Sequence, residues 1–218
     1  MRAFMPLVRK RPLPPAGDRR RRVVGLLGGS FNPAHQGHRF ISLLAISRFR
    51  LDEVWWLVSP GNPLKDSRSL LGLDERVRRA RMIVRHPKIR VTDLEKRLGT
   101  RFTADTLAAL KRRFPAIRFV WLMGADNLMQ IPQWDRWEKI FAAAPVAVFD
   151  RKPYTYRALA SRAAQRFGRA RLAGPRQREL ARSEPVAWSF VFYRRHPASA
   201  TDIRRKSGLD KLIERRNK

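Results

Sequence analysis

A glycine- and histidine-rich turn between two apolar runs constrains this chain more than any other feature of its sequence. The turn covers residues 28–38, GGSFNPAHQGH. A short apolar run over 23–27 precedes it, and a run over 38–49 with apolar residues at helical spacing follows it. A strand, a glycine turn and a helix start, in that order, present backbone N–H groups and a helix N-terminus to a phosphate. The glycines allow close approach of an anion because they lack a Cβ.

Two histidines of this turn, His35 and His38, are three residues apart and therefore lie near one another where the helix begins. Each imidazole can donate one or two hydrogen bonds to phosphate oxygens. Zn²⁺ binding is an alternative, but the chain has no cysteine and no acidic third ligand nearby. A plain turn with incidental histidines is the other alternative. The turn matches neither the Walker A pattern nor the dinucleotide fingerprint.

Strands and helices alternate along the rest of the chain, which predicts a parallel sheet covered on both faces. We expect further strands at 53–59, 89–91, 117–123, 146–149 and 187–193, and helices at 74–86, 103–114, 156–167 and from 199 onward. Asp74 and Thr103 are candidate N-caps. The length of 218 residues fits one domain over 23–218, preceded by a basic, proline-rich flexible extension over 1–22.

Unusual residues gather after the predicted strands. The glycine–histidine turn follows the first strand, Lys65 follows the second, Gly124 and Asp126 follow a later one, and Arg151 follows the next. Ligands of such α/β folds bind beyond the carboxyl ends of the strands, at the switch in strand order. The sequence therefore predicts one shared site at that edge of the sheet.

The net charge of +30 admits two interpretations. A nucleic-acid or membrane-surface partner is one. The other is a compositional bias toward arginine combined with an anionic small-molecule substrate. We favour the second because arginine is spread along the chain, as in the predicted helix that carries Arg76, Arg78, Arg79, Arg81 and Arg85. The cluster at 19–22 is the exception, and it adjoins the expected flexible extension.

The sequence shows neither a signal peptide nor an apolar run of the roughly 18 residues that suggest a membrane-spanning helix. The lack of cysteine excludes disulfides and thiol chemistry, and it favours a cytoplasmic location.

The turn over 28–38 resembles the signature of nucleotidyltransferases that share a His-x-Gly-His motif, and more specifically that of bacterial nicotinate-nucleotide adenylyltransferases. Four further segments resemble that family in order: FTADTL at 102–107, GADNL at 124–128 with Trp134 after it, Arg151-x-Pro153, and Ser199-x-Thr201-x-x-Arg204. The resemblance covers residues 23 to about 206. Three positions depart from the family pattern, namely Asn32 for aspartate, Leu64 for histidine and Phe102 for tyrosine.

The resemblance implies a Rossmann-like, doubly wound parallel sheet. It also implies transfer of the adenylyl group of ATP to nicotinate mononucleotide, giving deamido-NAD and pyrophosphate in NAD biosynthesis. Mg²⁺ is expected to be held mainly by the ATP phosphates, with no protein metal site. The acceptor phosphate is already anionic, so the reaction needs cations and hydrogen-bond donors more than a strong base.

Site residues carried over from the resemblance fall into three groups. The catalytic residues are His35, His38 and Arg204. ATP is expected to contact Gly28, Gly29, Ser30, Phe31, Lys65, Ser199 and Thr201. Nicotinate mononucleotide is expected to contact Phe102, Thr103, Gly124, Asp126, Trp134 and Arg151.

Several of these residues also have plain structural interpretations. Lys65 would be a surface lysine, Asp126 a helix cap, and Trp134 a core residue. The segment with Ser199, Thr201 and Arg204 would be an ordinary helix start.

Two other functions remain open at this point. One is a sister enzyme with another phosphate acceptor, such as phosphopantetheine or a polyol phosphate. The other is a basic RNA-binding protein built on an inactive nucleotidyltransferase fold. The oligomeric state does not follow from the sequence.

Overall fold

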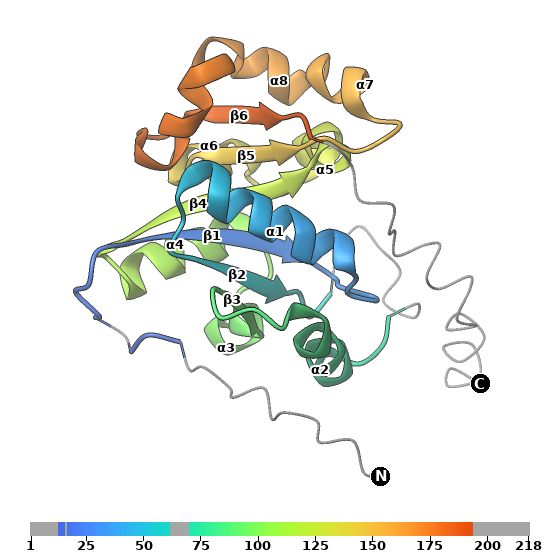
Figure 1. Ribbon diagram of the computed structural model, residues 1–218, viewed down its shortest axis with the longest axis vertical. Helices are drawn as coiled ribbons and strands as arrows, with labels where there is room; N and C mark the ends of the chain where they lie inside the picture. Colours follow the sequence, from blue (N-terminus) through green and yellow to red (C-terminus); the bar gives the residue numbers. More distant parts are fainter. Residues whose placement is uncertain (1–12, 16, 62–69, 194–218) are drawn as a thin grey trace.

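A single parallel sheet of six strands organises the computed structural model, which describes residues 13–15, 17–61 and 70–193. The strand order is β3-β2-β1-β4-β5-β6, and every neighbouring pair is parallel (Figure 1). The strands are β1 (Arg22–Gly29), β2 (Glu53–Val58), β3 (Ile89–Thr92), β4 (Ile117–Gly124), β5 (Val146–Phe149) and β6 (Trp188–Val191). The order reverses between β1 and β4, as in a doubly wound Rossmann-like sheet, so the predicted fold is confirmed.

Helices cover both faces of this sheet. The α-helices are α1 (Gln36–Phe49), α2 (Leu73–Val84), α3 (Leu94–Leu98), α4 (Thr103–Arg113), α5 (Ala125–Gln130), α6 (Trp137–Ala143), α7 (Thr155–Leu159) and α8 (Arg162–Arg166). Short 3₁₀ segments are η2 (Ile131–Gln133), η3 (Gly168–Ala170) and η4 (Gly174–Arg182). Figure 1 shows α1 lying across β1.

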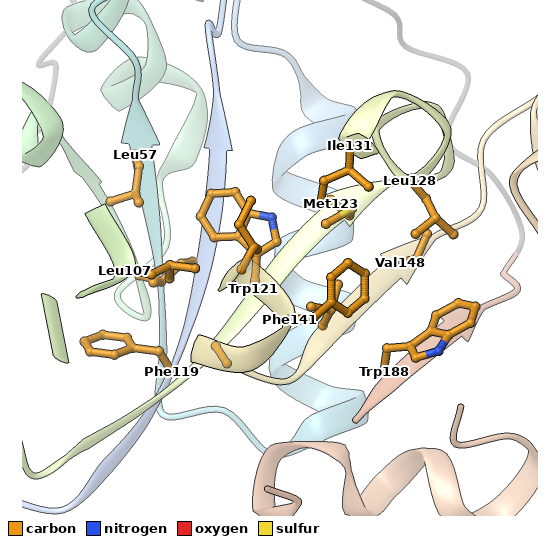
Figure 2. Close-up of a cluster of buried hydrophobic side chains, with 14 of the residues drawn as sticks. Leu57, Leu107, Phe119, Trp121, Met123, Leu128, Ile131, Phe141, Val148 and Trp188 are labelled. Atoms are coloured by element: carbon orange, nitrogen blue, oxygen red, sulfur yellow. The ribbon is translucent and has the colours of Figure 1, made fainter. Parts of the chain in front are cut away.

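The core has two halves, one on each face of the sheet, because successive residues of a strand point to opposite sides. In β2, for example, Trp55 and Leu57 belong to one buried cluster, whereas Trp56 and Val58 belong to the other. The first cluster packs under α3 to α8, and Figure 2 shows part of it around Trp121. The second packs under α1, α2 and η4. All six residues of β2 are buried, in agreement with its continuous apolar sequence.

The parallel arrangement places the carboxyl ends of β1, β2, β4 and β5 at one edge of the sheet. The register pairs Gly29 with Val58 at the ends of β1 and β2, and Gly124 with Phe149 at the ends of β4 and β5. The loops that follow these four strands therefore meet at the same edge, where the sequence predicts the site.

Several local predictions were wrong. Asp74 and Thr103 lie inside the first turns of α2 and α4, whose N-caps are Gly72 and Phe102, and neither helix has a side-chain cap. The helix expected over 156–167 is broken into α7 and α8, because Ser161 starts a new helix by accepting a hydrogen bond from Ala164 N at 3.4 Å.

Two more differences concern the ends and faces of helices. Helix α1 begins at Gln36, two residues before its expected start, and α3 was not expected. Met82 on α2 is 41% exposed although its side chain is apolar. The helical region expected from 199 lies outside the described residues.

The segment before β1 contacts the rest of the domain. Leu13 is partly buried against the first core cluster, and Gly17 N donates a hydrogen bond to Arg113 O at 3.1 Å. Strand β1 itself begins at Arg22. A flexible extension that ends at residue 22 stays a prediction. Among the described residues, none of the helices has the length and apolar character needed to cross a membrane.

Candidate active site

The turn after β1 is held against the sheet by aromatic packing. Phe31 has a left-handed backbone conformation with a φ of 47°, and its buried ring stacks on Trp56 of β2 at 4.9 Å. At Gly28 an added Cβ would lie 2.6 Å from the Trp121 ring, so this position must be glycine for β1 and β4 to pack as they do. At Gly29 the corresponding contact is an ordinary 3.4 Å. The turn is therefore a well-supported part of the fold.

Both predicted histidines lie at the N-terminus of α1 and cap it. His35 is the N-cap, and its Nδ1 accepts a hydrogen bond from Gly37 N at 3.1 Å. His38 Nδ1 accepts a hydrogen bond from His35 N at 3.2 Å, which completes a reciprocal capping box. The two ring centroids are 3.8 Å apart. Since each Nδ1 is an acceptor, a single proton on either ring is carried by Nε2.

His38 is an uncharged donor at neutral pH. Burial lowers its pKa well below the usual 6.5, and the nearby His35 and Arg151 lower the pKa further because positive charges oppose one another. A neutral ring with its proton on Nε2 can donate one hydrogen bond from that atom. The structure thus offers an oriented N–H donor at this position.

A second layer of side chains fixes His38. Ser42 Oγ donates to His38 O at 2.8 Å, and Trp56 Nε1 donates to Ser42 Oγ at 2.8 Å. Phe31 and Trp56 also pack near the imidazole, with ring centroids 4.8 and 5.8 Å away. Strand β2 and helix α1 therefore determine where His38 points.

The ends of β4 and β5 contribute an ion pair beside the histidines. Arg151 Nη1 donates to Asp126 Oδ2 at 2.8 Å, and the same Arg151 lies close enough to His38 to lower its pKa. Asp126 Oδ1 is buried and has no hydrogen-bond partner within the described part of the chain. An added Cβ at Gly124 would lie 2.4 Å from that oxygen, so a side chain there would displace the carboxylate. The orphan oxygen is an acceptor that a ligand hydroxyl could satisfy.

The predicted pyridine-binding residues lie on segments that follow β3 and β4. Phe102 is the N-cap of α4, Thr103 is the first residue of α4, and Trp134 is partly buried against the first core cluster. An ion pair between Arg136 Nη2 and Asp105 Oδ2 at 2.7 Å joins α4 to the segment of Trp134. Sequence reasoning missed Arg136, whose local signal was limited to the adjacent Asp135. Partial burial is compatible with Trp134 as a site wall.

Four predicted site residues lie outside the described residues: Lys65, Ser199, Thr201 and Arg204. Their roles stay predictions. Within the described ranges, no group of three histidine, aspartate or glutamate side chains could hold a metal ion.

Two buried charged residues near the turn were not predicted. Arg76 was counted among scattered arginines, but it is only 1% exposed and its guanidinium donates hydrogen bonds to main-chain carbonyl groups, including Ser30 O and Ser59 O, both at 2.7 Å. Glu95 is 6% exposed, and burial raises its pKa to about 7 although a hydrogen bond with Ser59 acts in the opposite direction. Neither residue belongs to a motif, so only the fold reveals their proximity to the strand ends.

Comparisons with known proteins show the family of this chain. The model of the cytidylyltransferase-like family matches residues 26–206. A probable nicotinate-nucleotide adenylyltransferase of Cereibacter sphaeroides is 54% identical over 84% of this chain and 96% of its own length. A relative of the same name from a Bradyrhizobium species is 48% identical over 85% of this chain and 96% of its own length.

A solved structure, the Plasmodium falciparum nicotinic acid mononucleotide adenylyltransferase complexed with NaAD, has the same fold. The two chains superpose with a TM-score of 0.59 at 17% identity, over 84% of this chain and 83% of the other. The family model and the relatives show that the chain belongs to the nicotinate-nucleotide adenylyltransferase family.

Proposed function

We propose that this protein transfers the adenylyl group of ATP to nicotinate mononucleotide, forming deamido-NAD and pyrophosphate in NAD biosynthesis. The observation that carries the proposal is the pair of imidazoles held by the capping box at the end of β1. The substrate assignment is supported by relatives about half identical over most of the chain.

The reaction is a displacement at phosphorus. An oxygen of the acceptor's 5′-phosphate attacks the α-phosphorus of ATP and forms a new P–O bond. The bond from the α-phosphorus to the bridging oxygen breaks, and pyrophosphate leaves with the electron pair. Because the nucleophile is already an anion, the protein has to align two anions and stabilise charge on the transferring and leaving oxygens.

The histidines supply part of that stabilisation. His38 Nε2 donates to an oxygen of the α-phosphate, and His35 binds the neighbouring phosphates. A neutral His38 is suited to this task because its single ring proton lies on Nε2 and the ring is partly shielded from water. The capping box and Ser42 hold the ring in place before ATP binds, so little reorganisation is needed.

Backbone groups of the turn complete the triphosphate site. Gly28 and Gly29 end β1 directly before the turn, and Ser30 and Phe31 donate from their backbone N–H groups. Outside the described residues, we assign Lys65, Ser199, Thr201 and Arg204 to the triphosphate as well, on the family resemblance. ATP enters as its Mg²⁺ complex, so the ion arrives with the substrate.

The acceptor occupies the side of the site formed by β4, β5 and α4. Trp134 stacks on the pyridine ring, Phe102 packs beside it, and the Thr103 hydroxyl donates to the nicotinate carboxylate. The partly buried position of Trp134, joined to α4 through Arg136, supports this arrangement.

Gly124, Asp126 and Arg151 hold the rest of the mononucleotide. The unpartnered Asp126 Oδ1 accepts a hydrogen bond from a hydroxyl of the ligand. Arg151 keeps the carboxylate oriented and brings positive charge close to the reacting phosphates.

An acceptor panel tests the proposal. With MgATP present, the purified protein is offered nicotinate mononucleotide, its amide, 4′-phosphopantetheine and a polyol phosphate, and adenylylated products are separated by chromatography. We expect deamido-NAD with equimolar pyrophosphate. Turnover with phosphopantetheine or the polyol phosphate alone would replace the proposal by a sister activity, and no turnover with the acid or the amide would refute it.

The RNA-binding alternative receives little support from the arginine cluster at 19–22. Arg20 pairs with Asp18 at 2.9 Å, and Arg22 pairs with Glu53 at 3.3 Å, so two of the four guanidinium groups are already engaged. Salt-sensitive RNA binding that survives loss of His38 but not of these arginines would favour that alternative. We also propose a cytoplasmic location, on the absence of cysteine in the sequence.

A further inference from the structure

Arg76 connects three segments around the triphosphate-binding turn. Its Nη1 donates to Ser30 O and Ser59 O, both at 2.7 Å, and its Nη2 donates to Pro60 O at 3.1 Å. Its Nε donates to Leu71 O at 2.7 Å. One guanidinium thus joins the turn after β1, the end of β2 and the segment just before α2. The five donors of an arginine in a fixed fork make this possible, whereas a lysine ammonium could not match the geometry.

The charge of Arg76 has no acidic partner in the described part of the chain. The residue is 1% exposed, its hydrogen bonds go to main-chain oxygens, and no carboxylate there forms an ion pair with it. Burial lowers its pKa. A buried cation without a counter-ion is costly. An anion bound on the far side of the turn would offset that cost.

The hydrogen bonds of Arg76 also set the direction of backbone donors. The Ser30–Phe31 peptide is trans, so its C=O and N–H point in opposite directions. Because Arg76 holds Ser30 O, the Phe31 N–H is directed away from Arg76. The preceding peptide is held in the same manner, since Ser59 N donates to Gly29 O at 3.0 Å and thereby orients the Ser30 N–H.

We propose that Arg76 is a positioning residue for the triphosphate: it orients the Phe31 N–H donor through Ser30 O and the Ser30 N–H donor through Ser59, and it places a buried positive charge behind the turn. This inference rests on the proposed ATP-binding role of the turn and deepens it. Arg76 does not touch the nucleotide. It acts through Ser30 and through the end of β2, so its loss weakens ATP binding and transfer while the acceptor pocket on α4 and β4 is unaffected.

The test compares Arg76→Lys, Arg76→Met and Arg76→Ala with Arg79→Met. Arg79 is a matched control because it lies on the same helix but pairs with Glu75 at 2.6 Å. For each variant, the dissociation constant of MgATP is measured by calorimetry without acceptor, and KM and kcat are measured for both substrates. Unfolding by denaturant checks the folded fraction. Guanidinium and methylammonium ions are added separately to Arg76→Ala at millimolar concentration.

We expect Arg76→Met to raise both the dissociation constant and the KM of MgATP by roughly 100-fold, which is the size of effect seen when a charged donor is lost at a phosphate site. Arg76→Lys should raise both constants by roughly 10-fold. The KM of the acceptor should stay within about twofold for these variants, since acceptor binding uses other contacts. Arg79→Met should match wild type. Guanidinium should restore part of the activity of Arg76→Ala, because its planar set of N–H donors can reproduce the hydrogen bonds of Arg76 to the main-chain oxygens. Methylammonium lacks this geometry and should not restore activity.

A purely structural role predicts another pattern, in which kcat falls with the folded fraction, both KM values stay unchanged and guanidinium has no effect. That pattern, or wild-type ATP affinity in a folded Arg76→Met or Arg76→Lys, would overturn the inference. If Arg76→Met fails to fold, the lysine variant and the guanidinium rescue decide. Failure of the proposed function would look different, because wild type itself would then form no deamido-NAD.

Discussion

Replacing Glu95 with glutamine tests the environment behind the strand ends through the pH dependence of stability. Glu95 is 6% exposed on α3, and burial raises its pKa from 4.5 to about 7. Because the folded protein binds this proton more tightly than the unfolded chain does, the contribution to stability is complete below pH 4.5. It is lost as the pH rises through about 7.

The interval between the two pKa values sets the size of the effect. Each pKa unit corresponds to about 1.4 kcal/mol, so the full effect is about 3 kcal/mol, of which about 2 to 3 kcal/mol falls between pH 5 and pH 8. Glutamine does not titrate. As the pH rises from 5 to 8, the free energy of unfolding of wild type should therefore decrease by about 2 to 3 kcal/mol relative to that of Glu95→Gln.

Urea unfolding of both proteins at pH 5, 6, 7 and 8 measures this difference, and the titration of every other group, His38 included, largely cancels between them. Glu184→Gln is the control, because it makes the same substitution at a side chain that is 83% exposed. Two results would refute the reasoning. The difference in unfolding free energy between wild type and Glu95→Gln could stay constant with pH, or the variant could lose stability relative to wild type as the pH rises.

Two further substitutions test the geometry around the site. Gly124→Ala places a Cβ 2.4 Å from Asp126 Oδ1 and should raise the KM of the acceptor by roughly tenfold, because it displaces that carboxylate. The control Gly168→Ala adds a Cβ in open space and should leave this KM unchanged. Equal kinetics of the two variants would contradict this prediction. Ser42→Ala leaves the buried Trp56 Nε1 without its acceptor and should cost about 1 to 3 kcal/mol in urea unfolding. A loss below about 0.5 kcal/mol would show that this bond contributes little.

The strand pattern was predictable because burial on both faces leaves a continuous apolar run. Strand β2 shows this most clearly, with six consecutive buried residues. The position of the site followed from the same logic, since glycines, histidines and charges came directly after predicted strands. The structure places His35, His38, Asp126 and Arg151 close together at that edge.

Residues whose role depends on tertiary contacts were not predictable. Arg76 lies among four other arginines of one helical stretch, and nothing local distinguishes the buried one from its solvated neighbours. The break between α7 and α8 depends on a cap at Ser161 inside an otherwise helical sequence. Asp74 resembled an N-cap, but the backbone enters α2 one residue earlier at Leu73, after Gly72.

The capping role of the two histidines was also missed, because serine, threonine and aspartate are the usual signals for helix starts. The structure shows that one pair of side chains can begin α1 directly after the end of β1, where we propose that the phosphates bind. A motif can thus have a structural and a chemical role at the same positions.

The rate of deamido-NAD formation by His38→Ala tests the central claim most directly. The control is His86→Ala, since His86 lies before β3, at the opposite edge of the sheet, and bonds Lys88 N at 3.2 Å. With nicotinate mononucleotide and MgATP, we expect wild type and His86→Ala to release equimolar pyrophosphate. His38→Ala should lose roughly 100-fold or more in kcat, with a loss of stability of only about 1 kcal/mol. Full turnover by a folded His38→Ala, or none by wild type, would contradict the account.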